Sequence, residues 1–309
     1  MAFTRLAHAC ALAATLGLTA CSGGGGGTSG GGKTSLSVSL MDAPVDDVTE
    51  VHVKIDKIWL KPTDGQAMEL TLTNGPVTLD LLPLTDQNPA LLIDSAEVPP
   101  GSYDWLRMDV SASFDGIYDS YVVTDTGGEE EVRVPSGTVR LVDGFEIGPN
   151  QAVKLLFDWD LRKGLVDPPG QPGYLLKPAF RMLNVQELGV LTGTVAADTI
   201  MGTGDPNHCL ADDPDPLVGN VVYVFAGNVT PDDVDGIEPD PVATADVTQN
   251  DAGDFVYRTV IAPGDYTIAF TCQAKNDYPE VDESTTTPVE FVSPVMQTVT
   301  ADMETVVDF

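Results

Sequence analysis

The chain has 309 residues, a formal net charge of -32 and a hydrophobic content of 42%. Nucleic-acid binding needs a basic face, so we exclude nucleic acid as a partner of a chain this acidic. The apolar content is sufficient for packed cores, which excludes an acidic disordered tail. The carboxylates are spread along the chain, and we interpret most of them as a solvated surface suited to a salty medium.

Residues 1–20 have the features of a secretory signal peptide. Arg5 is their only charge, and the apolar segment from Ala9 to Leu18 is too short to span a bilayer as a helix. The segment ends in Leu18-Thr19-Ala20-Cys21, which resembles the cleavage and lipidation box of bacterial lipoproteins. The resemblance implies that Cys21 becomes the mature N-terminus and carries acyl chains such as palmitate, which anchor it to a membrane. The alternative is an ordinary signal peptide cut near Ala20, with Cys21 as a spare thiol.

The residues after Cys21 predict where the protein resides. In enterobacterial lipoproteins an Asp at the next position retains the protein at the inner membrane, and Ser22 stands there in this chain. The resemblance therefore implies the cell envelope, at the outer membrane of a Gram-negative bacterium. Residues 21–33 are nearly all Gly, Ser and Thr, which predicts a flexible linker between the lipid and the folded body.

About 280 residues follow the leader, a length that predicts two domains rather than one. We place the first domain at residues 34–187 and the second at residues 188–309. Both consist of short apolar-alternating segments separated by turn residues. We therefore predict an all-β chain, with two β-sandwich-type domains in tandem behind a disordered signal and linker segment.

Eight strands are expected in the first domain. They cover residues 36–40, 51–60, 103–114, 117–124, 129–134, 138–147, 152–162 and 174–185. The apolar phase slips by one residue after Ile55, which predicts a β-bulge near Asp56 and Lys57. Asn74-Gly75 predicts a tight turn, and residues 81–96 leave a short helix and an irregular crossover open.

The segment 152–162 has the clearest period of two. One face carries Val153, Leu155, Phe157, Trp159 and Leu161. The other face carries Lys154, Asp158, Asp160 and Arg162, and only Leu156 interrupts it. We predict a half-buried strand on which Asp158 and Arg162 form an exposed ion pair, worth less than about 1 kcal/mol.

Several segments of the first domain together resemble the bacterial domain-of-unknown-function family 4382. They are Leu40 to Pro44, Val51 to Leu60, Pro100 to Tyr103, Val134 to Gly137, Leu155 to Lys163 and Tyr174 to Pro178. The resemblance covers the domain in order. Family members are typically exported bacterial lipoproteins without an assigned activity, so the resemblance implies a location and a fold type but no reaction.

Asp42-Ala43-Pro44 interrupts the first strand. We interpret it as a structural turn in which the Asp42 carboxylate accepts backbone N–H groups. The weaker alternative is a cation site formed with Asp46 and Asp47, because calcium needs six or more oxygen ligands.

Five strands are expected in the second domain, at residues 189–195, 221–225, 242–248, 255–261 and 266–272. Its Gly-x-Val opening, Ala-Gly strand end, Asp-Gly turn and Pro-Gly-x-Tyr strand resemble the carboxypeptidase-regulatory or transthyretin-like Greek-key β-sandwich. The resemblance implies a rigid spacer or binding module. Pro-Gly-x-Tyr occurs at Pro100 and again at Pro263, and both positions predict type II turns.

Cys209 and Cys272 form an even pair in an exported chain, which predicts a disulfide. Such a bridge closes a loop of roughly 60 residues and contributes about 4 kcal/mol in the chain-entropy model. Metal binding by the two thiols and His208 is the weaker alternative, because a fourth ligand is missing.

No metal or cofactor is expected. Asp233, Asp235 and Glu238 are weak calcium candidates, since their spacing departs from a calcium loop and a solvated loop explains them better. Outside the glycine-rich linker the chain contains no Gly-x-Ser-x-Gly, and it contains no His-Glu-x-x-His. We expect a non-enzymatic, membrane-anchored binding or structural module with an envelope protein or glycan as partner. The alternative is a saccharide-active hydrolase that uses an acidic carboxylate pair.

Overall fold

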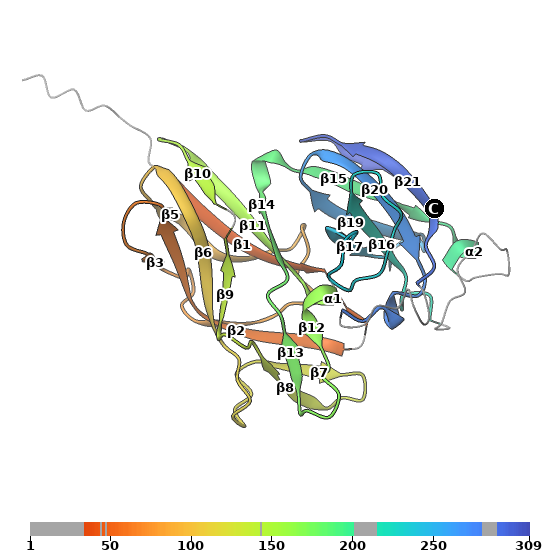
Figure 1. Ribbon diagram of the computed structural model, residues 1–309, viewed down its shortest axis with the longest axis horizontal. Helices are drawn as coiled ribbons and strands as arrows, with labels where there is room; N and C mark the ends of the chain where they lie inside the picture. The colour runs from red at the N-terminus through yellow and green to blue at the C-terminus, as the bar shows by residue number, and fades with distance from the viewer. Residues whose placement is uncertain (1–33, 44, 47, 143, 201–214, 280–288) are drawn as a thin grey trace, which may run out of the picture. The chain divides into compact units, whose positions relative to one another are not determined.

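The computed structural model describes residues 34–43, 45–46, 48–142, 144–200, 215–279 and 289–309. Residues 32–309 form one compact unit. Its regular structure is nearly all β, so the predicted fold class is confirmed (Figure 1). The helical segments of the described residues are α1 (Leu161–Gly164), α2 (Ala197–Ile200) and the 3-10 turns Val185–Glu187 and Ala274–Asn276. None of the described helices is long and apolar enough to cross a membrane.

The smaller sheet of the N-terminal half has the strand order β14-β11-β1-β5. Its strands are β1 (Ser35–Ala43), β5 (Ala90–Glu97), β11 (Ala152–Asp160) and β14 (Phe180–Asn184). β1 and β11 run parallel, in register from Ser35 opposite Ala152 to Ala43 opposite Asp160. Parallel strands are commonly covered on both faces, and the last six residues of β11 are all buried.

The larger sheet of this half has the order β10-β6-β2-β7-β8-β13-β12, with β3 and β4 also paired to β2 and β9 to β6. Its strands are β2 (Val48–Pro62), β3 (Met68–Leu70), β4 (Val77–Asp80), β6 (Gly101–Ser111), β7 (Tyr121–Thr124), β8 (Glu129–Arg133), β9 (Thr138–Leu141), β10 (Phe145–Ile147), β12 (Leu165–Val166) and β13 (Tyr174–Leu176).

The long strand β2 changes its buried phase part-way along. The register against β6 shifts between Ile55 and Lys57, which is the bulge that the apolar pattern predicts. Because of this shift, both Ile55 and Ile58 are fully buried. Side chains from both sheets join one core, which includes Trp159 of β11 in the smaller sheet and Ile58 of β2 in the larger one.

The C-terminal half has two further sheets, with the orders β18-β19-β15-β22 and β17-β16-β20-β21. Their strands are β15 (Gly189–Val195), β16 (Val221–Ala226), β17 (Ala243–Asp246), β18 (Thr248–Gln249), β19 (Phe255–Ile261), β20 (Gly264–Thr271), β21 (Val292–Val299) and β22 (Glu304–Val306). The two sheets share a core that includes Leu191, Tyr257 and Phe270. Separate folding of the halves at the predicted boundary, 187/188, stays a prediction.

The repeated Pro-Gly-x-Tyr motif has a different basis from the one predicted. A type II turn needs a φ near +80° at its third residue, whereas Gly101 has a φ of 151° and Gly264 has no positive φ. The predicted type II turns are therefore wrong. Instead, the Tyr103 hydroxyl donates to the Pro99 carbonyl, and the Tyr266 hydroxyl donates to the Ala262 carbonyl at 2.8 Å. Each tyrosine thus secures the start of its strand to the chain four residues upstream.

Three predicted segments need correction. The strand expected at 152–162 ends at Asp160, whose carboxylate caps α1 by accepting the N–H of Lys163 at 3.2 Å. The segment 174–185 is split around Pro178 into β13 and β14, because proline cannot donate to a ladder. The undecided region 81–96 contains most of β5.

Candidate functional site

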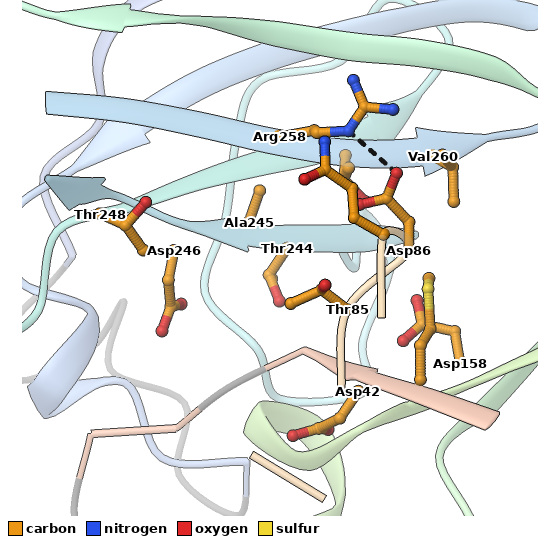
Figure 2. Close-up of a pocket in the computed structure, with 13 residues that line it drawn as sticks. Asp42, Thr85, Asp86, Asp158, Thr244, Ala245, Asp246, Thr248, Arg258 and Val260 are labelled. Atoms are coloured by element: carbon orange, nitrogen blue, oxygen red, sulfur yellow. Dashed lines mark hydrogen bonds and ion pairs between the residues drawn. The ribbon is translucent and has the colours of Figure 1, made fainter. Parts of the chain in front are cut away.

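A pocket of about 210 Å³ lies where β1 and β11 meet β17 and β19 (Figure 2). We call it the junction pocket. Its polar lining comes from both halves of the compact unit. The residues that matter below are Asp42, Asp86, Asp158, Thr244, Asp246 and Arg258.

Arg162 of α1 is the most buried cation of this region, with 2% of its surface exposed. One guanidinium nitrogen donates to the Ala274 carbonyl at 3.0 Å. Another pairs with Asp46 at 3.1 Å and with Asp246 of β17 at 3.3 Å. Asp46 also accepts the N–H of Gly219 at 3.0 Å. Arg162 and Asp46 together therefore connect the N-terminal half to three segments of the C-terminal half, at Ala274, Asp246 and Gly219.

Two more arginines make the same kind of connection. Arg181 of β14 pairs with Asp158 and also donates to the Thr259 hydroxyl of β19 at 3.3 Å. Arg258 of β19 pairs with Asp86, which precedes β5, at 2.9 Å, as the dashed line in Figure 2 marks. We call Arg162, Arg181, Arg258 and their partners the junction network. The predicted exposed pair between Asp158 and Arg162 is wrong, because both are buried and each has other partners.

An apolar cluster accompanies the network. Leu156 of β11 is buried together with Met41, Leu183 and Val260, and the last of these comes from β19. Leu156 interrupts the polar face of its strand in the sequence because that face packs against the C-terminal half. The isolated leucine was the signal that this face is covered, and sequence reasoning missed it.

Burial changes the protonation of several junction carboxyls. It raises the pKa of Asp246 to about 7, although the nearby Arg162 acts in the opposite direction. It raises the pKa of Asp160 to about 6 against the effect of Lys163. Burial, and then the charges of Asp158 and Asp160, hold the pKa of Asp42 well above its ordinary value. These carboxyls bind protons more tightly than exposed ones do.

Asp42 accepts a backbone N–H, as predicted, but the donor is Leu161 at 3.3 Å rather than a neighbour in its own turn. Its other oxygen is buried without a protein partner, which suits a protonated carboxyl. Ala43 pairs with Asp160 along the ladder, and Pro44 lies outside the described residues. Asp46 is engaged by Arg162, and Asp47 is also outside the described residues.

The acidic loop of the C-terminal half is held by protein contacts. Asp235 accepts the N–H of Ile237 at 2.7 Å, and Asp277 accepts the N–H of Val234 at 3.0 Å. The carboxylates of Asp233, Asp235 and Glu238 are all described, and their oxygens do not gather within 4.8 Å of one another. The structure thus does not bring these weak calcium candidates together.

Most residues of the predicted disulfide and lipidation sites lie outside the described residues. Cys272 follows β20 and is buried in the core of the C-terminal half. Its predicted partner Cys209, the neighbouring His208 and the lipidation residue Cys21 are not among the described residues. The disulfide and the lipid anchor therefore stay predictions.

Comparison with known proteins identifies the N-terminal half. Residues 33–178 match the family described as domain of unknown function (DUF4382). The chain contains a DUF4382 domain. The resemblance drawn from the sequence is confirmed for this region, and Asp42, Asp158 and Arg162 all belong to the DUF4382 domain.

No curated protein matches this chain. Among solved structures, the TIE protein of Bacillus anthracis is similar at 14% identity with a TM-score of 0.20, and the match covers 90% of this chain. This chain spans only 33% of that protein's length. GBS52, the minor pilin of Streptococcus agalactiae, matches at 11% identity and a TM-score of 0.18, over 89% of this chain and 94% of that one. A Bacteroides ovatus protein proposed to be an adhesin matches at 9% identity and a TM-score of 0.17, over 88% of this chain and 89% of that one. Similarities this low carry no argument about function.

Proposed function

We propose that this protein is a non-enzymatic binding or structural module of the bacterial cell envelope, anchored by lipid on Cys21. The junction network carries the proposal. Three buried or half-buried arginines link the two halves of residues 32–309, and each pairs with a carboxylate that lines the junction pocket. Ion pairs that link the two β-sheet halves in this way are typical of a rigid scaffold rather than of a reactive site.

The size of the junction pocket argues against a ligand site in that pocket. Ligand sites commonly have volumes of about 300 to 1,000 Å³. The junction pocket, at about 210 Å³, is smaller than that range. A rigid body on the glycine-rich linker 21–33 is suited to presenting a surface at a distance from a membrane. An envelope protein or glycan is the partner that we propose for that surface.

Expression of the full chain in a Gram-negative bacterium fed with labelled palmitate tests the anchor. We expect label on the wild-type chain and recovery in the outer-membrane fraction. Cys21→Ser is expected to lose the label and leave that fraction, while Cys10→Ser, within the leader, keeps both. An unlabelled wild-type chain, or a membrane-bound Cys21→Ser variant, would contradict the proposal.

One observation favours a saccharide hydrolase as a second candidate. Asp246, with a pKa raised to about 7, and Asp158 both line the junction pocket, and a glycosidase uses two carboxyl groups that flank the bond it cleaves. Incubation of the full chain with envelope glycans, followed by measurement of reducing ends, decides between the candidates. We expect no release. Release that disappears in both Asp158→Asn and Asp246→Asn would establish the hydrolase instead.

A further inference from the structure

A second group of chemically active side chains lies on the outer face of the larger sheet, within the DUF4382 domain. Glu50 and His52 are two residues apart on β2, so their side chains share a face. Asp80 of β4 stands directly opposite His52 in the ladder. Val51 and Val53, on the other face of β2, are fully buried in the core. The sheet therefore presents Glu50, His52 and Asp80 together toward solvent.

The ligand atoms of these three residues converge. The Nε2 atom of His52 lies 2.6 Å from the Oε2 atom of Glu50. One potential ligand atom from each of the three residues lies within 4.8 Å of the other two. Among the described residues, no other group of three or more His, Cys, Asp or Glu side chains has this spacing. Two ligands bound tetrahedrally at about 2.0 to 2.2 Å from one metal ion lie about 3.3 to 3.6 Å apart, so the hydrogen bond between Glu50 and His52 opens slightly when the ion binds.

Neighbouring groups hold the three side chains in place. Tyr121 of β7 stacks on the His52 ring, with centroids 4.4 Å apart and planes 18° from parallel. One oxygen of Asp80 accepts the N–H of Val51 at 3.1 Å and that of Leu82 at 3.4 Å. The other Asp80 oxygen has no such backbone contact. Groups outside a metal's ligand set commonly orient its ligands in this way.

The local electrostatic field favours a cation. The carboxylates of Glu50 on β2 and Asp80 on β4 lie beside one imidazole, that of His52 on β2. Two carboxylates and a neutral imidazole carry two negative charges, which one divalent ion balances.

We propose that Glu50, His52 and Asp80 bind one divalent transition-metal ion, and that Zn²⁺ fits them best. One imidazole nitrogen with two carboxylate oxygens is a donor set that zinc accepts, whereas calcium and magnesium prefer oxygen ligands alone. Three protein ligands leave a fourth tetrahedral position open to water or to a donor from another molecule. The site is independent of the junction network and of the envelope proposal.

Calorimetric titration of the full chain with ZnCl₂ tests this site. We expect one zinc per chain with micromolar or tighter affinity. His52→Gln and Asp80→Asn are expected to weaken zinc binding at least about tenfold. Even the loss of a group that only orients a metal ligand commonly lowers metal affinity by about that factor. Glu69→Gln is the matched control, because Glu69 lies on β3 beside β2 and pairs only with the exposed Lys57. It should bind zinc like the wild type.

Cobalt substitution gives a second readout. Co²⁺ bound at this site should show visible d–d bands that His52→Gln removes, without a thiolate charge-transfer band. Circular dichroism of each variant checks that it folds, and His52→Gln alone tests the site if Asp80→Asn does not fold. Unchanged zinc affinity in His52→Gln, a thiolate band, or no one-to-one binding at micromolar zinc would each overturn the proposal.

Discussion

At the scale of single residues, two tyrosine hydroxyls fix the starts of their strands. Tyr103 and Tyr266 each donate to a carbonyl four residues upstream. Because a typical hydrogen bond contributes about 1 kcal/mol, Tyr103→Phe and Tyr266→Phe should each lower the free energy of unfolding by about that amount. Urea denaturation measures the change. Tyr118→Phe, on a ring that is 48% exposed, is the control, and equal effects in all three variants would contradict the assignment.

Asp246 makes stability depend on pH. Its pKa in the folded protein is raised to about 7, above the ordinary value of 3.8, so the folded state binds the proton more tightly than the unfolded chain. The stabilisation from this proton is complete below the unfolded pKa and is lost as pH rises through about 7. We expect the free energy of unfolding of the wild type to fall between pH 4 and pH 8, relative to Asp246→Asn.

Unfolding in urea across that pH range checks the prediction. The asparagine cannot titrate but keeps an oxygen that can accept from Arg162. Asp254→Asn, an exposed carboxyl, is the control and should follow the wild-type profile. Parallel profiles for the wild type and Asp246→Asn would show that the Asp246 pKa is not raised by folding.

The polar residues of the junction show what alternation can and cannot predict. The period of two in β11 correctly predicts that Leu155, Phe157 and Trp159 face the core. It also suggests that Asp158 faces water, yet Asp158 is 2% exposed. The arginines that cover this region belong to other segments, and a local pattern contains no information about such partners. The candidate site was therefore not predictable, although Asp42 was singled out for its position in a turn.

At the scale of elements, β11 is a strand with two buried faces. One face enters the core of the N-terminal half, and Leu156 on the other meets Val260 of β19. Leu156→Ala should lower the free energy of unfolding by about 2 to 5 kcal/mol, as buried leucine truncations do. Leu91→Ala, at a 46% exposed position of β5, should change it by less than about 0.5 kcal/mol. Urea unfolding of both variants measures the contrast, and equal effects would mean that Leu156 is not packed.

Strands with a clear period of two were predictable, whereas the three-residue β3 and the eight-residue β5 and β21 were not. β2 and β19 contain enough alternating residues to show a period of two, and even the bulge in β2 is visible as a change of phase. β3 has three residues, too few for any period. The Pro-Gly pairs mark the right places for strands to begin. The backbone there is held by the tyrosine hydrogen bonds and does not form the predicted type II turn.

At the scale of the whole described unit, composition and strand spacing suffice to predict an all-β fold. How the halves join is set by contacts such as those of Arg162 with Asp246 and with the Ala274 carbonyl, which are 84 and 112 residues away along the chain. Alternation within one segment cannot reveal contacts at such separations. The described structure therefore adds the coupling between the halves to what the sequence predicts.

That coupling has a measurable consequence. All three tryptophans, Trp59, Trp105 and Trp159, lie in the DUF4382 domain, so tryptophan fluorescence reports unfolding of the N-terminal half alone. Far-ultraviolet circular dichroism reports the strands of both halves. If the junction network couples the halves, the two signals should give the same urea midpoint for the wild type.

Arg162→Met should separate the two midpoints. The substitution leaves Asp46 and Asp246 without their shared cation, and removing one partner of a buried ion pair commonly destabilises by about 3 to 5 kcal/mol. Lys54→Met is the control, because Lys54 pairs with Asp119 on a half-exposed surface within one half. Its two midpoints should still coincide. Separate midpoints already in the wild type, or coincident midpoints in Arg162→Met, would mean that the halves are not coupled through this arginine.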